Sequence, residues 1–163
     1  MKLSDVINQL QSGDIIARRT TTFFSNIIRR WTGETWAHCG VIWIDTQGVA
    51  WIFQSFPGIG VECVPLASML PFDWIHIGRP LSPAALALAQ SQVGKPYGWI
   101  DLALVSIGLH PRQNGLICSE YAARILATNG ALDSTVAFGA VTPGMLVEWL
   151  LDAGAPLKSI EFN

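Results

Sequence analysis

Residues 36–56 read WAHCGVIWIDTQGVAWIFQSF, and this stretch decides the fold. Two runs rich in β-branched and aromatic residues, 36–44 and 49–56, flank the sequence DTQG at 45–48, which is typical of a hairpin turn. We therefore expect two antiparallel strands. Because successive side chains of a strand point to opposite faces, His38 and Cys39 should lie on opposite sides of this hairpin.

The length of the hairpin loop decides which polar side chain shares a face with His38. A three-residue loop that ends in Gly48 places Gln54 on that face, whereas a two-residue turn shifts the register by one and brings Ser55 there. Glycine at the third loop position is a common hairpin solution. The sequence therefore favours Gln54.

The rest of the chain extends the hairpin into an α+β pattern. The devices Ser82-Pro83 and Thr142-Pro143 each predict an N-cap followed by proline at the first helical position. The spacing of apolar residues predicts helices over 3–11, 20–32, 83–93, 118–128 and 143–153, and strands over 15–17, 36–44, 49–56, 59–66 and 74–79. We expect a compact antiparallel sheet or barrel followed by packed helices, in a single domain spanning residues 1–163.

The composition is apolar, and the basic residues form no cluster of the kind that binds nucleic acid. Half of the 163 residues are hydrophobic, so the chain can bury a core and still spare some of its seven Trp and seven Phe for a groove. The net charge is −2 and the ten basic residues are scattered, which argues against a nucleic-acid partner.

The cysteine content and the first residues indicate a reducing compartment. Three cysteines at irregular spacing form no disulfide framework. The chain opens with a polar stretch, MKLSD, and its longest apolar run, Leu102–Leu109, is far short of the about 20 residues that a membrane-spanning helix needs. We expect a cytoplasmic protein without a transmembrane segment; export by a route that leaves no signal stays open.

Cys118 differs from the other two cysteines in its local setting. It begins a predicted helix directly after a loop, where free N–H groups and the positive end of the helix dipole favour a thiolate. Cys63 lies within a strand-like run, and Cys39 points away from its neighbour His38. The competing interpretation is structural: Cys118 as a small apolar residue on the inner face of its helix, and His38 as a satisfied core histidine.

Five short motifs follow one another in a particular order: GDII at 13–16, WAHCGV at 36–41, GV with PL at 60–61 and 65–66, GKPY at 94–97, and ICSE at 117–120. Together they resemble the circularly permuted branch of the NlpC-type, papain-like superfamily, which includes the YiiX-like amidases and the lecithin retinol acyltransferase relatives. In that branch the histidine strand precedes the cysteine helix, and here the order is His38, Gln54, Cys118. The resemblance spans roughly residues 12 to 127.

The resemblance implies a circularly permuted papain-like fold and a cysteine hydrolase that needs no cofactor. Cys118 would attack a carbonyl, His38 would take and return the proton, and a thioacyl intermediate would follow. Gln54 would orient the histidine at a position that is often Glu in YiiX-like members. Tyr97 matches a family tyrosine near the nucleophile, where it either helps bind the oxyanion or substrate or serves only in packing.

Three functions remain open at this point. The superfamily's common substrate is a peptide bond, including that of cell-wall peptides, whereas the Trp and Phe content suits an acyl-lipid substrate of a hydrolase or acyltransferase. A catalytically silent module that binds a peptide or lipid is the third reading, since the neutral Gln54 replaces an acid. A metal site is not expected, because the His and Cys residues lack the usual ligand spacing.

Four further polar residues are expected to be structural. Asp14 lies at the entry to the first strand, where an aspartate readily accepts bonds from nearby backbone N–H groups. Glu120 falls in the first turn of its helix and is expected to form an ion pair or to stabilise the dipole. We expect His76 and His110 to be structural or solvated.

Overall fold

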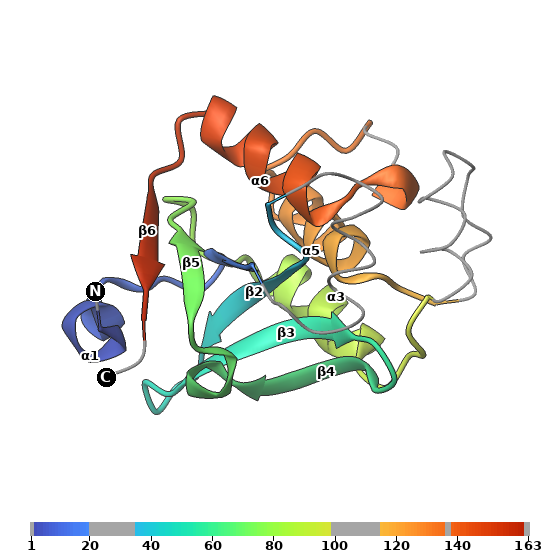
Figure 1. Ribbon diagram of the computed structural model, residues 1–163. Coiled ribbons are helices and arrows are strands. Elements are labelled where there is room, and N and C mark those ends of the chain that lie inside the picture. Colours follow the sequence, from blue (N-terminus) through green and yellow to red (C-terminus); the bar gives the residue numbers. More distant parts are fainter. Residues whose placement is uncertain (1, 20–34, 99–114, 136–137, 162–163) are drawn as a thin grey trace.

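The computed structural model describes residues 2–19, 35–98, 115–135 and 138–161 (Figure 1). The predicted helix over 20–32, the apolar run 102–109 and His110 lie outside these residues. In chain order the elements are α1 (Leu3–Val6), the 3-10 helix η1 (Ile7–Gln9), β1 (Ile15–Arg18), β2 (His38–Ile44), β3 (Ala50–Phe56), β4 (Gly60–Pro65), the 3-10 helix η2 (Leu66–Met69), β5 (Phe72–Ile75), α3 (Pro83–Gln92), α5 (Cys118–Thr128), the 3-10 helix η3 (Phe138–Ala140), α6 (Pro143–Asp152) and β6 (Leu157–Ile160).

Within the described residues, six strands form one antiparallel sheet in the order β4-β3-β2-β1-β5-β6. The register of the central hairpin pairs Ile44 with Ala50, and the Asp45 N–H donates to the Val49 carbonyl at 3.0 Å. Gly48 has φ +81°, as the last position of a three-residue loop requires. The predicted register is therefore confirmed.

The two faces of the sheet bury separate apolar clusters, as alternation requires. Helices α3, α5 and α6 lie on one side of the strands, where Val41 and Phe53 pack with Leu126 (Figure 1). On the other face, Ile42 and Ile52 form a second cluster with residues of α1, η2, β5 and β6. The helix-side cluster contains Cys39 and Cys118, so this face positions the candidate site.

The helix starts follow from their caps. The Ser82 hydroxyl accepts the Ala85 N–H at 3.2 Å, and the Thr142 hydroxyl accepts the Met145 N–H at 3.1 Å. Proline follows each cap at the first helical position, where its missing N–H costs nothing. Both predicted devices are confirmed.

Apart from shifts of one or two residues at element ends, the structure departs from the sequence prediction at a strand, a helix and an omitted strand. The strand expected over 74–79 is β5, at Phe72–Ile75, because the chain turns away after Ile75: the Ile77 N–H donates to the Asp14 carboxylate at 3.0 Å, and Gly78 has φ +69°. The helical stretch 3–11 divides into α1 and η1. Strand β6, which the prediction omitted, returns after the helices and pairs with β5.

The GKPY segment at 94–97 docks on the free edge of β4. The Val61 N–H donates to the Lys95 carbonyl at 2.9 Å, and the Gly94 N–H donates to the Val61 carbonyl at 2.8 Å. Gly60 lies beneath this contact with φ +98°, and a Cβ there would collide with the Lys95 carbonyl oxygen. The close approach therefore requires glycine.

We expect Gly60→Ala to lower the free energy of unfolding by roughly 3 kcal/mol, since it combines backbone strain with a backbone collision. The matched control is Gly48→Ala, which has a similar positive φ of +81° but nothing within 4 Å of the added methyl group. That variant should lose about 1 kcal/mol. Urea unfolding of both proteins measures the difference, and equal losses would contradict the proposed close approach.

Candidate functional site

The N-terminus of α5 places Cys118 where three segments meet. The Leu116 N–H donates to the Pro96 carbonyl at 3.2 Å, and the Gly98 N–H donates back to the Leu116 carbonyl at 3.3 Å. The Ser55 hydroxyl of β3 donates to the same Leu116 carbonyl at 2.5 Å. These bonds connect the segment before Cys118 to β3 and to the GKPY motif.

The first turn of α5 is fixed by two further contacts. The Ser119 hydroxyl donates to the Val141 carbonyl at 2.5 Å. Glu120 is buried and pairs with Arg124 one turn later at 2.6 Å, so its expected role in an ion pair is confirmed. The Ser119 bond ties the helix start to the segment before α6, and the Glu120–Arg124 pair lies within α5 itself.

His38 and Gln54 are joined by a short side-chain contact across the β2–β3 pair. The His38 Nε2 lies 2.6 Å from the Gln54 Oε1, and both side chains are buried. The Phe56 ring meets the imidazole edge to face, with centroids 5.6 Å apart. The predicted pairing of His38 with Gln54 is thus present, and the imidazole is held from two sides.

The pKa of the Cys118 thiol is lowered well below its ordinary value. A hydrogen bond from the Cys39 side chain is the largest cause, and burial opposes it. The charge of His38, a hydrogen bond from His38 and one from the Cys39 backbone then lower the pKa further. The surroundings of Cys118 therefore favour its thiolate form.

Cys39 is a neighbour of the site that sequence reasoning missed. Alternation predicts that it lies on the opposite face of β2 from His38, and the structure shows that this face meets the helices. That argument was used only to set Cys39 aside as a nucleophile. The same face carries Cys118, so the Cys39 thiol lies within hydrogen-bond reach of it.

Tyr97 lies beside both thiols. It is 7% exposed, and its segment pairs with Leu116, two residues before Cys118. Burial raises the pKa of the Tyr97 hydroxyl above its ordinary value, and the nearby Cys118 and Cys39 raise it further. The hydroxyl therefore stays protonated and can donate a hydrogen bond.

Glu62 is the second residue that sequence reasoning missed. The Gln54 Nε2–H donates to the Glu62 Oε1 at 2.9 Å, and the two residues face each other in the β3–β4 pair. The short three-residue turn over 57–59, which contains Pro57 and Gly58, was the available signal. It pairs Phe56 with Gly60, and the register then brings Glu62 opposite Gln54.

Cys63 has the properties of an unreactive thiol. Burial raises its pKa to about 11, and the neighbouring Glu62 carboxylate adds to this effect. No thiolate forms there near neutral pH. The expectation that Cys63 lacks activation is confirmed.

Asp14 and His76 belong to a different part of the molecule. Asp14 is fully buried, and its carboxylate accepts the Gln11 N–H at 2.9 Å, the Trp74 indole N–H at 2.9 Å and the Ile77 N–H at 3.0 Å. His76 Nδ1 lies 3.1 Å from the same carboxylate. Asp14 therefore has the turn-forming role expected of it, and His76 is structural.

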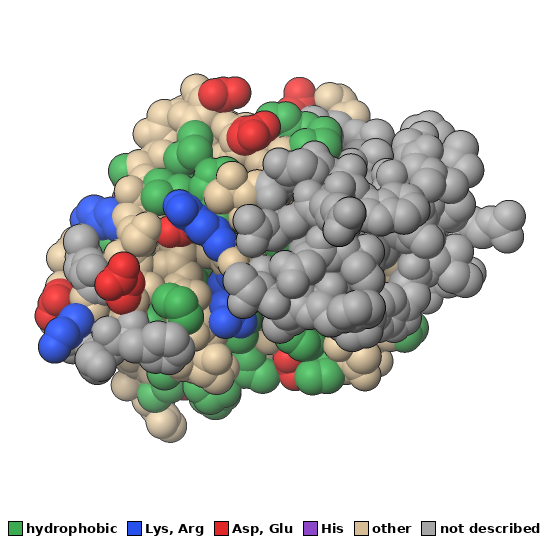
Figure 2. All heavy atoms as spheres, viewed as in Figure 1, with side chains coloured by type: hydrophobic (Ala, Val, Ile, Leu, Met, Phe, Trp, Pro, Cys, Tyr) green, Lys and Arg blue, Asp and Glu red, His purple; other side chains and the backbone are tan. Residues whose placement is uncertain are grey.

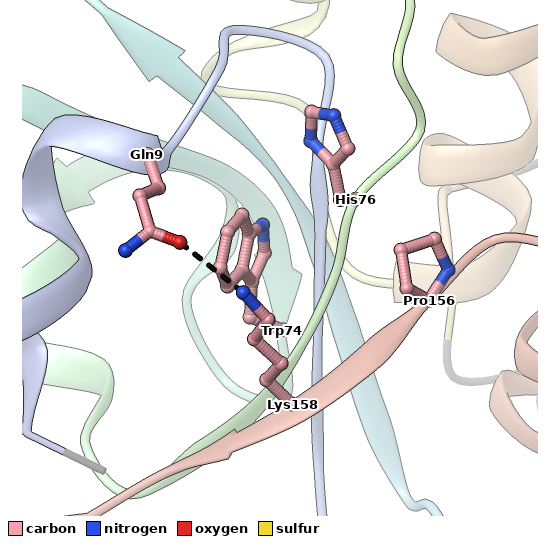
Figure 3. Close-up of a pocket in the computed structure, with 5 residues that line it drawn as sticks. All are labelled: Gln9, Trp74, His76, Pro156 and Lys158. Atoms are coloured by element: carbon pink, nitrogen blue, oxygen red, sulfur yellow. Dashed lines mark hydrogen bonds between the residues drawn. The ribbon is translucent and has the colours of Figure 1, made fainter.

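A cavity of ≈180 Å³ opens beside this cluster (Figure 3). It is lined by Gln9, Trp74, His76, Pro156 and Lys158. The Lys158 ammonium lies 5.0 Å from the centre of the Trp74 ring and 3.1 Å from the Gln9 Oε1, which holds it across the opening. None of the predicted site residues lines this cavity.

The remaining features of the described residues concern metal-ligand groups, membrane-spanning helices and surface charge. No group of three or more His, Cys, Asp or Glu side chains that could hold a metal ion occurs among residues 2–19, 35–98, 115–135 and 138–161. No helix in the same ranges is long and apolar enough to cross a bilayer. On the described part of the face in Figure 2, basic and acidic side chains are interspersed with hydrophobic ones.

Comparison with solved structures identifies the fold. The crystal structure of the metalloprotein YiiX from Escherichia coli O157:H7 superimposes with a TM-score of 0.66 at 16% sequence identity, covering 95% of this chain and 98% of that chain. No protein-family model matches the sequence, and no curated protein matches it. The chain has the α+β fold of YiiX, so the expected likeness to the YiiX-like, permuted papain-like proteins is confirmed for the fold.

Proposed function

We propose that this protein is a cysteine hydrolase that cleaves an amide bond through a thioacyl intermediate. The observation that carries the proposal is the buried arrangement of Cys118, His38 and Gln54 at the start of α5, in which the pKa of Cys118 is lowered. A thiol nucleophile needs a base within reach, and that base needs an orienting partner. The fold shared with YiiX agrees with an NlpC-type hydrolase.

In the proposed reaction, the Cys118 thiolate attacks the substrate carbonyl carbon while the imidazolium of His38 holds the proton. That proton passes to the departing amine as the C–N bond breaks, which leaves the acyl group on sulfur. Neutral His38 then takes a proton from water, whose oxygen attacks the thioester. Release of the carboxylic acid restores Cys118, and Gln54 orients the imidazole throughout.

The backbone N–H of Cys118 and the Tyr97 hydroxyl are the proposed donors to the oxyanion. The N–H lies in the first turn of α5, where backbone donors have no partner within the helix. Tyr97 lies beside the thiol and keeps its proton. Donors aimed at the developing negative charge lower the barrier of acyl transfer.

The test is site-resolved alkylation of the cysteines with iodoacetamide across pH, in the wild type and in His38→Ala. We expect Cys118 to react with an inflection well below the about 8.5 of an ordinary thiol. In His38→Ala the inflection should rise, because the buried thiolate then lacks its cation, while the Cys39 hydrogen bond still holds part of the lowering. Cys63, with a pKa of about 11, is the internal control and should react slowly near pH 7 in both proteins.

The alternative outcome is equally informative. If Cys118 behaves as an ordinary thiol in both proteins, the hydrolase proposal fails and a silent peptide- or lipid-binding module replaces it. If Cys118 is reactive, matched acyl amides, thioesters and phospholipids then distinguish a peptidase from a lipid acyl hydrolase or acyltransferase.

A further inference from the structure

Glu62 supplies a carboxylate directly behind Gln54. The Gln54 amide bridges the two neighbouring strands: its Oε1 lies 2.6 Å from His38 Nε2, and its Nε2 donates to the Glu62 Oε1 at 2.9 Å. Gln54 is 2% exposed, whereas Glu62 is half-buried. The negative charge is therefore two hydrogen bonds from the imidazole.

This arrangement sets the orientation of the Gln54 amide. An ionised carboxylate only accepts hydrogen bonds, so it must face the NH₂ end of the amide. The Gln54 oxygen then faces His38, and because a carbonyl oxygen also only accepts, the His38 Nε2 must carry a proton. The other ring nitrogen, Nδ1, is left to exchange a proton with Cys118.

The reversed amide would have two consequences. The Gln54 oxygen would face the Glu62 carboxylate, which opposes two acceptors at 2.9 Å. The Gln54 NH₂ group would face His38 and require an unprotonated Nε2, which moves the proton of the neutral ring to Nδ1. That tautomer cannot accept a proton from Cys118.

We propose that Glu62 is a positioning residue of this site: its carboxylate selects the Gln54 orientation and hence the His38 tautomer, and it places a negative charge two hydrogen bonds behind the imidazole. This inference rests on the proposed function. It also accounts for a neutral residue at position 54, because the charge that an acid would place there comes from β4 instead.

Other titratable groups face the same site. Arg18 of β1 pairs with His38 in the sheet register, Cys118 of α5 interacts with His38, and Cys39 of β2 and Tyr97 lie beside Cys118. The following substitutions leave all of these in place. A changed pH profile of Cys118 is therefore attributable to Glu62 and Gln54.

The experiment compares Glu62→Gln with the charge-exchanged variant Gln54→Glu/Glu62→Gln, using the pH profile of Cys118 alkylation. In Glu62→Gln we expect the inflection to rise by about one pH unit, and alkylation at a pH below the wild-type inflection to slow about tenfold. The double variant should return the inflection to the wild-type value, because a carboxylate at position 54 accepts from both His38 and the new amide at 62. A purely structural role for Glu62 would not produce this rescue.

Two controls keep the outcomes separate. Glu148→Gln, on the exposed face of α6, makes the same chemical change away from the site and should leave the profile unchanged. Cys63 should become more reactive in Glu62→Gln, because Glu62 helps raise its pKa; this confirms that the charge has been removed.

An unchanged Cys118 profile in Glu62→Gln would overturn the role of Glu62 while the His38-dependent reactivity of the wild type still supported the hydrolase. An ordinary Cys118 thiol in the wild type would overturn both. If Glu62→Gln does not fold, the double variant carries the test: a wild-type inflection supports the inference, and an ordinary one overturns it.

Discussion

Cys118→Ala is expected to lower kcat/KM by roughly a thousandfold or more on any amide or thioester that the wild type cleaves, because the proposed bond to the acyl group forms at this sulfur. Intact-mass measurement should detect an acyl adduct on the wild type and none on the variant. Retention of more than a tenth of the activity in Cys118→Ala would contradict covalent catalysis at this residue.

The other two cysteines provide graded controls for that result. Cys63→Ala removes a half-buried thiol whose pKa is about 11, and it should leave kcat/KM unchanged. Cys39→Ala removes the hydrogen bond that contributes most to lowering the pKa of Cys118. We expect a loss of about tenfold there, with the pH inflection of Cys118 moved upward, since a hydrogen bond to a charged group is involved.

Asp14→Ala is expected to lower the free energy of unfolding by roughly 3–5 kcal/mol, without a direct effect on Cys118. The fully buried carboxylate accepts N–H bonds from Gln11, Trp74 and Ile77, and each donor would lose its partner away from water. Urea unfolding measures the loss. These donors come from the segment before β1, from β5 and from the turn after it, so their release affects two parts of the sheet.

The chain contains a matched control for Asp14. Asp45 also accepts two backbone N–H groups and one indole N–H, from Gln47 at 2.8 Å, Val49 at 2.9 Å and Trp51 at 2.9 Å. Asp45 lies in the hairpin loop, where water can replace the lost acceptor. Asp45→Ala should therefore lose far less stability than Asp14→Ala, and equal losses would show that burial is not the deciding factor.

The sequence was most informative where a local signal had a single geometric solution. Gly48 required a positive φ, which set the loop length and therefore placed Gln54 beside His38. The paired caps at Ser82 and Thr142 located two helices for the same kind of reason. In each case, neighbouring residues alone determine the outcome.

The sequence prediction is weaker where contacts between residues far apart in the chain determine the end of a strand or the role of a side chain. Strand β5 ends at Ile75 because the Asp14 carboxylate, more than sixty positions earlier in the chain, accepts a hydrogen bond from the Ile77 N–H. The sequence around Ile77 gives no sign of that bond. Strand β6 forms because it pairs with β5, and its four residues alone are too few to predict a strand. The roles of Cys39 and Glu62 depend on which elements face them, although the short turn before Gly60 would have placed Glu62 opposite Gln54.

The docking of residues 94–97 on β4 has a consequence for self-association. Strand β4 forms one edge of the sheet, and an edge strand with free backbone groups can recruit a strand from another chain. Here the N–H and the carbonyl of Val61 are occupied by Lys95 and Gly94, while Pro65 at the end of the strand offers no N–H. A substitution that loosens this segment should therefore displace Tyr97 and also open the edge to intermolecular pairing, so loss of activity and aggregation would arise together.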